Sequence, residues 1–162
     1  MRNDKEEGDD QLSYREQLRQ RVGQAPLLLV KATVAVLDKR HRILLVKREQ
    51  DAEWNIPEGF MELKETAEET GQRIVFTLAG LKLGELGLLG VYSGEQYYTV
   101  SEQGEATYPV ILNFVSKDIK EIPNEPQHTE AIEARFFPLD QLPAETAQLA
   151  NEVIQQYGPA FF

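Results

Sequence analysis

Residues 54–81, WNIPEGFMELKETAEETGQRIVFTLAGL, contain the pattern from which the fold of this 162-residue chain can be inferred. Ala67, Gly71 and Val75 recur at i, i+4 and i+8, which is the spacing of a helix face packed on a sheet. Gly71 costs a helix about 1 kcal/mol relative to alanine. Either close approach to a neighbouring strand or a weak constraint would explain it. The segment predicts a helix packed on a sheet.

A second face of this helix carries Ile74, Thr77 and Leu78. These positions are related as i, i+3 and i+4, so their side chains cluster within about one helical turn. The face is therefore mostly apolar, and an exposed patch of this kind would indicate a contact with a partner or with a second copy of the chain.

The same segment resembles the signature of the Nudix hydrolase family. That signature is a glycine, five residues, a glutamate, seven residues, Arg-Glu, an aliphatic residue, any residue, two glutamates, any residue, glycine and an aliphatic residue. The residues that match it are Gly59, Glu65, Arg73, Val75, Gly80 and Leu81. The three helix glutamates are replaced by Ile74, Thr77 and Leu78.

The resemblance implies a magnesium-dependent pyrophosphohydrolase in which those glutamates hold the metal ions. Magnesium takes hard oxygen ligands in near-octahedral geometry. Ile74 and Leu78 offer no ligand, and the Thr77 hydroxyl is a poor substitute for a carboxylate. We therefore expect the usual activity to be lost or severely impaired.

A second register of the signature would use Lys64 to Gly71, KETAEETG, as its glutamate half. Glu65, Glu68 and Glu69 would then be the metal ligands. This register leaves only four residues between Gly59 and Lys64, where the signature has thirteen. The first register is therefore favoured.

The resemblance extends over residues 12–157 and is closest to a bacterial branch of the family. Two further runs carry it: VGQAPLLL from Val22 and RFFPLDQLP from Arg135. It implies an α/β fold, namely a Nudix-type α/β/α sandwich with a mixed β-sheet.

The expected elements follow from periodicity and turn residues. Helices are expected over residues 11–22, over the signature helix and over 143–157, with Pro143 in the first turn. Strands are expected over residues 32–38, 43–48, 85–100, 107–118 and 131–137. A polar turn containing glycine favours a hairpin between the third and fourth strands.

Composition limits the function classes. The net charge of −10 argues against non-specific binding to nucleic acid, which depends on Lys and Arg. The chain has no cysteine and its longest apolar run is too short to span a bilayer. Residues 1–10 are expected to form a disordered tail and residues 11–162 a single domain. No secretory signal is visible, so a cytoplasmic location is expected.

Some candidate site residues come only from the family frame. Glu130 matches a carboxylate that often precedes the last long strand, where it completes a metal shell or acts as general base. With Glu62 and Glu65 it would form a residual magnesium site, in which Glu65 and Glu130 would be catalytic. The alternative is that Glu130 lies on a solvated strand edge.

Other candidates point to ligand binding. Arg48 and Arg73 would meet a phosphate, although Arg73 is favoured to pair with Glu69 four residues earlier. Gly59 lies in the signature loop. Trp54 and Tyr98 are candidates for contact with a base or ribose, although packing in the core or at a strand edge is favoured for both.

Two function classes remain. The first is a Nudix-fold binding protein for a nucleoside-diphosphate-linked ligand, or for a partner, including a second copy, at the face formed by Ile74 and Leu78. The second is an active hydrolase of nucleoside diphosphates linked to another group, such as ADP-ribose or a nucleotide sugar, with magnesium held by Glu62, Glu65 and Glu130.

Overall fold

The computed structural model of the chain describes residues 12–121 and 131–162. Its helices are α2 (Tyr14–Val22), α3 (Ala67–Ala79) and α4 (Gln148–Tyr157), with short 3-10 helices η1 (Glu95–Tyr97) and η2 (Gly158–Ala160). Its strands are β1 (Leu27–Val36), β2 (Arg42–Arg48), β3 (Glu58–Phe60), β4 (Lys82–Leu83), β5 (Gly87–Tyr92), β6 (Thr99–Val100), β7 (Ala106–Ser116), β8 (Ile119–Glu121) and β9 (Ala131–Pro138).

The main sheet is mixed. Its strands follow the order β3-β1-β7-β5, and β6 also pairs with β7. The long central pair β1 and β7 is parallel, whereas β3 and β5 run antiparallel to their neighbours. Two smaller sheets pair β2 with β9 and β4 with β8. The expected mixed sheet is confirmed.

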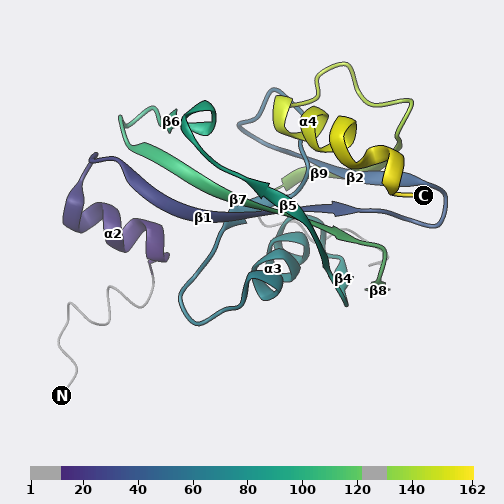
Figure 1. Cartoon of the computed structure of the whole chain (residues 1–162), viewed down its shortest axis with the longest axis horizontal. Coiled ribbons are helices and arrows are strands. Elements are labelled where there is room, and N and C mark those ends of the chain that lie inside the picture. The colour runs from purple at the N-terminus through teal and green to yellow at the C-terminus, as the bar shows by residue number, and fades with distance from the viewer. Residues whose placement is uncertain (1–11, 122–130) are drawn as a thin grey trace.

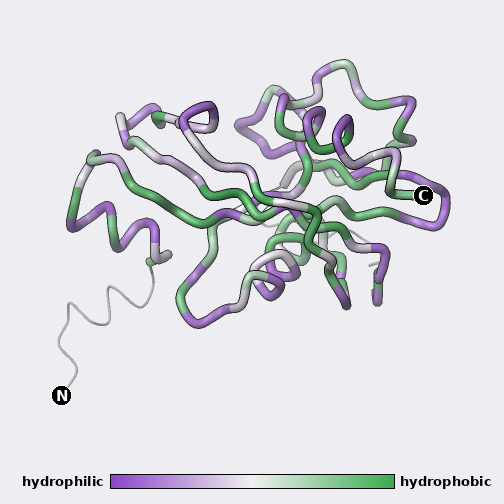
Figure 2. The backbone as a smooth tube through the Cα atoms, viewed as in Figure 1, coloured by the Kyte–Doolittle hydropathy of each residue, from purple (hydrophilic) through white to green (hydrophobic). Residues whose placement is uncertain are grey.

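Helices cover the strands on two sides, with α3 below the strands in Figure 1 and α4 above them. Successive side chains of a strand point to opposite faces. Accordingly, Val34 on β1 and Leu44 on β2 join the core beneath α3, while Ala35 and Leu45 join the core beneath α4. Figure 2 shows the hydrophobic residues concentrated along the central strands, whereas α2 is largely hydrophilic. This arrangement is the α/β/α sandwich expected from the sequence.

Helix α3 begins with a capping box. The Thr66 hydroxyl accepts a hydrogen bond from the Glu69 amide, and the Glu69 carboxylate accepts one from the Thr66 amide. The helix ends at Gly80, whose left-handed conformation (φ 70°) favours glycine. Thr66 and Gly80 therefore fix which residues of the signature segment are helical.

Gly71 lies on α3 at a close approach to the sheet. A Cβ atom at this position would lie 2.6 Å from Leu86 Cδ2 and 3.1 Å from Val34 Cγ2. Of the two explanations left open by the sequence, tight packing against the strands is the one the structure supports.

Three expected elements differ from those observed. The first strand, β1, begins at Leu27 and not at residue 32. The strand expected over residues 85–100 is interrupted at Gly94, which has a φ of 105° and precedes the 3-10 helix η1. The closing helix begins at Gln148 and not near Pro143. The backbone before this helix is hydrogen-bonded to Trp54. The Trp54 N–H donates to the Glu145 carbonyl, and the Trp54 carbonyl accepts from the Ala147 N–H, both at 2.7 Å. The antiparallel pairing of β5 and β6 with β7 confirms the hairpin.

The disordered tail expected over residues 1–10 lies outside the described residues. Within residues 12–121 and 131–162, no helix is both long and apolar enough to cross a membrane.

Candidate functional site

A cleft of about 390 Å³ lies where α2, β1, β3 and α3 meet. We call it the basic cleft, because it contains four cationic and three anionic side chains in a chain of net charge −10. Its lining residues are Ser13, Arg15, Glu16, Lys31, Arg48, Glu58, Gly59, Phe60, Glu62, Arg73, Ile74, Thr77 and Leu78.

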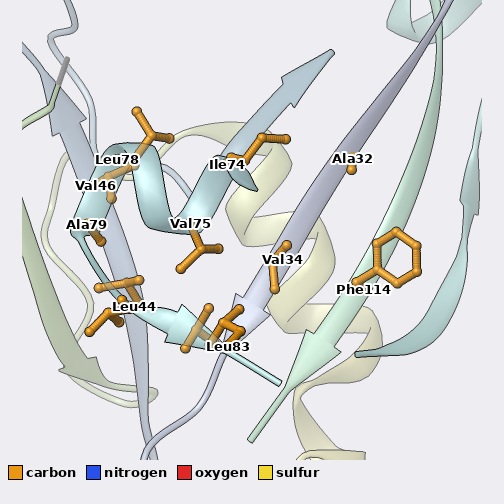
Figure 3. Close-up of a cluster of buried hydrophobic side chains, with 12 residues drawn as sticks. Ala32, Val34, Leu44, Val46, Ile74, Val75, Leu78, Ala79, Leu83 and Phe114 are labelled. Atoms are coloured by element: carbon orange, nitrogen blue, oxygen red, sulfur yellow. The ribbon is translucent and has the colours of Figure 1, made fainter. Parts of the chain in front are cut away.

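The α3 face that borders this cleft belongs to the hydrophobic core. Ile74 is 3% exposed and Leu78 is 2% exposed, and both belong to the core beneath α3. Figure 3 shows these two side chains on one side of the helix and Val75 on the other. The prediction of a partner surface at Ile74 and Leu78 is therefore wrong, because both side chains are buried and neither is available to a partner. The homodimer suggested by that apolar face stays a prediction without its surface.

Ile74 packs directly beneath the strand that carries Gly59. A Cβ atom added to Gly59 would lie 2.9 Å from both Cδ1 and Cγ1 of Ile74. Only a residue without a side chain allows this approach. Ile74 therefore fills the space between α3 and β3 with hydrocarbon at the position where the family signature has a carboxylate.

Glu65 precedes α3 and is held by several donors. Its Oε1 accepts hydrogen bonds from the Glu62 amide at 2.8 Å, from Thr70 Oγ1 at 2.7 Å and from Arg73 Nη2 at 2.8 Å. Its Oε2 accepts from Arg73 Nε at 3.0 Å. Desolvation raises the pKa of Glu65, but the hydrogen bonds and the positive charge of Arg73 outweigh it, so the pKa is lowered overall.

Arg73 also donates to the Phe60 carbonyl at 2.9 Å. Its guanidinium therefore connects α3 to both ends of the signature loop. The helical spacing had suggested that Arg73 pairs with Glu69. The structure pairs it with Glu65. The Glu69 carboxylate is used in the capping box.

The remaining acids of the cleft are also engaged. Glu62 Oε2 accepts a hydrogen bond from the Tyr14 amide at 2.8 Å, which ties the start of α2 to the signature loop. Lys31 Nζ lies 3.0 Å from Glu58 Oε2. Their geometry is not that of a hydrogen bond, since the same oxygen is buried without a hydrogen-bond donor among the described residues. We regard the pair as a purely electrostatic contact.

Arg48 and Arg15 differ from these residues. Arg48 Nη2 donates to the Glu58 carbonyl at 3.2 Å, and the Arg15 guanidinium lies 5.0 Å from the centre of the Phe60 ring. Within the part of the chain that the structure describes, neither forms an ion pair with a carboxylate. Arg48 and Arg15 are therefore the cations of the cleft that no described carboxylate pairs with.

The described residues of the cleft do not fit magnesium. No group of three His, Cys, Asp or Glu side chains in residues 12–121 and 131–162 is placed to hold a metal ion. Both oxygens of Glu65 already accept hydrogen bonds, and the α3 face is hydrocarbon at Ile74 and Leu78. Glu130, the third member of the predicted residual site, lies outside the described residues.

A second cleft of about 240 Å³ adjoins the basic cleft and shares Lys31 and Glu58 with it. We call it the aromatic cleft. Its lining residues are Lys31, Asn55, Glu58, Gln96, Tyr97, Tyr98, Thr99, Pro109, Ile111, Gln148, Leu149 and Glu152. The Tyr98 side chain is 40% exposed, and its ring lies against that of Tyr108 with centroids 4.7 Å apart. Tyr98 therefore lines the aromatic cleft as an exposed residue.

Trp54 lies away from both clefts. It packs edge-on against Phe137 with ring centroids 5.1 Å apart and lies beside the core beneath α4. The structure thus brings Arg48, Gly59 and Arg73 together in the basic cleft and puts Tyr98 in the adjoining one.

Sequence reasoning missed Lys31 and Arg15. The only signal for Lys31 is that it is a single charge within an otherwise apolar strand. Arg15 carries no such signal, because only the packing of α2 brings it to the cleft.

Comparison with known proteins agrees with the fold. The model of the NUDIX domain matches residues 27–157. No curated protein matches the chain. A MutT NUDIX hydrolase from Burkholderia pseudomallei shares 22% identity with a TM-score of 0.66, covering 80% of this chain and 98% of that protein.

Two other solved structures give similar values. A NUDIX hydrolase from Nitrosomonas europaea shares 18% identity with a TM-score of 0.64, over 83% of this chain and 90% of its own. A mutator MutT protein from Bacillus halodurans shares 18% identity with a TM-score of 0.60, covering 79% of this chain and 80% of that protein. At these identities the likeness concerns the fold, whereas the domain match spans most of the sequence. The chain belongs to the Nudix family.

Proposed function

We propose that this Nudix-family protein binds a nucleoside-diphosphate-linked ligand, and that magnesium-dependent hydrolysis is lost or severely impaired. The observation that carries the proposal is the burial of Ile74 and Leu78 beside a basic cleft. Hydrocarbon stands where the family signature has metal-binding carboxylates, while the positive charge needed to attract phosphate remains.

The two adjoining clefts match the two parts of such a ligand. The diphosphate would bind near Arg48, Arg73 and Gly59 in the basic cleft, and the base or ribose near Tyr98 in the aromatic cleft. Charged phosphates bind well to guanidinium groups, and bases stack on exposed aromatic rings. Lys31 lies in both clefts, next to the link between the two parts.

Hydrolysis of a pyrophosphate needs strong stabilisation of developing negative charge. In this protein, the Glu65 carboxylate accepts hydrogen bonds from Arg73, Thr70 and the Glu62 amide, and so holds the signature loop to α3. We therefore assign Glu65 a positioning role and expect the bound ligand to remain intact.

Isothermal titration calorimetry with ADP, ADP-ribose, a nucleotide sugar, ATP and AMP tests the proposal. We expect the diphosphate-linked compounds to bind and AMP to bind at least tenfold more weakly, since it lacks the second phosphate. Failure of all five compounds to bind at millimolar concentration would refute the proposed ligand class. Turnover with magnesium or manganese would instead favour an atypical site built from Glu62, Glu65 and Glu130.

A further inference from the structure

We infer that the basic cleft binds the diphosphate group directly through Arg48 and Arg15, without a divalent metal ion. This inference rests on the proposed function and specifies how the same site recognises phosphate.

The first argument is the state of the cationic side chains. Arg73 is neutralised by Glu65, and Lys31 lies 3.0 Å from Glu58. Arg48 makes a single hydrogen bond, to a carbonyl, and Arg15 rests on the Phe60 ring. A guanidinium presents five N–H donors in a planar fork that matches phosphate oxygens. Arg48 and Arg15 therefore have donors and net charge available for an anion.

The second argument is that no carboxylate among the described residues pairs with either arginine. Glu65 and Glu58 each have another cationic partner. Glu62 accepts the Tyr14 amide hydrogen, which holds its carboxylate in place without removing its charge. Glu16 is exposed, so solvent screens it. Two guanidinium groups that have no carboxylate partner among the described residues are therefore left to receive a diphosphate.

The third argument is that the helix carrying Arg15 is fixed in place. One turn further along α2, the buried Arg19 donates to the Ala106 carbonyl at 2.5 Å and to Thr107 Oγ1 at 3.0 Å. At the other end, the Tyr14 amide bonds to Glu62. Both ends of α2 are thus attached to the rest of the fold, so the backbone that carries Arg15 does not have to be ordered when a ligand binds.

Magnesium should consequently weaken diphosphate binding to this cleft, whereas it strengthens binding at a carboxylate site. In a carboxylate site the ion joins the protein to the phosphates and strengthens binding. In this cleft no described carboxylate group is placed to receive it. Magnesium in solution would only chelate the diphosphate and lower its negative charge, which weakens its attraction to Arg48 and Arg15.

Calorimetric titration with inorganic pyrophosphate tests the metal dependence. We expect binding in the presence of EDTA, with an affinity that falls at least threefold when magnesium exceeds pyrophosphate and falls further as ionic strength rises. Binding that requires magnesium, or that magnesium strengthens, would overturn the inference.

Matched variants test the two arginines. Arg48→Gln and Arg15→Gln should each weaken pyrophosphate binding in EDTA about tenfold, which corresponds to the loss of one charge-assisted hydrogen bond. The controls are Lys47→Gln, on the same strand, and Arg21→Gln, on the same helix; neither residue lines the cleft. Arg48→Lys keeps the positive charge but lacks the planar guanidinium. Its pyrophosphate affinity should lie between that of the natural protein and that of Arg48→Gln. Losses no larger than those of the controls, in variants whose thermal midpoints match, would overturn the inference.

The same titrations separate the two proposals. Pyrophosphate binding in EDTA without any nucleotide binding would refute the nucleoside ligand and leave the arginine site standing. Nucleotide binding that requires magnesium would refute the arginine site and leave the nucleoside ligand standing.

Discussion

Ile74 packs against Gly59 so closely that a Cβ atom on Gly59 would lie 2.9 Å from two Ile74 carbons. This contact joins α3 to β3 through hydrocarbon at the centre of the signature segment. Nudix hydrolases bind metal at the corresponding helix position, as the resemblance implies. The contact is therefore part of the core here, and its energetics can be measured.

The substitution Gly59→Ala tests that contact. We expect it to lower the free energy of unfolding by about 1–3 kcal/mol, because the added methyl group displaces Ile74. In a background of Ile74→Ala, which itself costs about 2–5 kcal/mol, the effect of Gly59→Ala should nearly vanish. Urea denaturation of all four proteins gives the coupling free energy. Additive effects would mean that the two residues do not press on each other.

The Glu65 and Arg73 pair predicts a pH dependence of stability. The pKa of Glu65 is lower in the folded chain than its ordinary value of 4.5, so the folded state binds fewer protons there than the unfolded state. Its contribution should be complete above about pH 4.5 and be lost as the pH falls through the lower, folded pKa.

The substitution Glu65→Gln should accordingly cost about 1–3 kcal/mol at pH 7, as expected for loss of charge-assisted hydrogen bonds. Its difference from the natural protein should shrink in acid, below the range in which Glu65 titrates. Glu68→Gln is the control, because Glu68 is exposed in the first turn of α3. A difference that stays constant down to the acid limit would contradict the assigned pKa shift.

Restoring the signature glutamates should have unequal costs. Leu78 is 2% exposed, so Leu78→Glu should lower the free energy of unfolding by about 3 kcal/mol or more, since it puts a carboxylate into the core. Thr77 is only half-buried, and Thr77→Glu should cost less than about 1 kcal/mol. Thermal denaturation of both variants checks the order, and equal losses would contradict the burial of this face.

The triple variant Ile74→Glu, Thr77→Glu, Leu78→Glu extends this test to metal binding. If it folds, magnesium should raise its thermal midpoint, because a ligand that binds only the folded state stabilises it. The natural protein should show no such rise. A magnesium-dependent rise in the natural protein would reveal carboxylates that we have not placed in the site.

Tyr98 should distinguish the two parts of the ligand. Tyr98 is 40% exposed in the aromatic cleft, and its ring lies against that of Tyr108. Tyr98→Ala should weaken binding of ADP about fivefold to a hundredfold, the range expected for loss of one stacking contact. Pyrophosphate binding serves as the internal control and should not change. Equal loss for both ligands would place Tyr98 outside base recognition.

Much of the fold could be predicted from the sequence, because it depends on local patterns. The spacing of Ala67, Gly71 and Val75 predicted a helix on a sheet, and the polar turn containing glycine predicted the hairpin. What failed depended on distant contacts. Trp54 pairs with the backbone before α4 and delays that helix, and the capping box leaves Glu69 unavailable to Arg73.

The site was predictable only in part for the same reason. The signature located Gly59, Arg73 and the apolar positions in one segment. It did not show that Ile74 would be buried against Gly59, because burial depends on how β3 lies over α3. The signature also did not indicate that Arg15 lines the cleft. The position of α2 depends on hydrogen bonds from Arg19 to Ala106 and Thr107, which are 87 and 88 positions away in the sequence.

The most direct test of the central claim, that the site binds its ligand without the family's metal-dependent chemistry, is a single-turnover measurement. Excess protein is mixed with ADP-ribose and magnesium, and the nucleotide is recovered and separated after binding has saturated. We predict that ADP-ribose is recovered intact at a level equal to the control without protein. Accumulation of AMP and ribose phosphate, abolished by EDTA, would contradict the account.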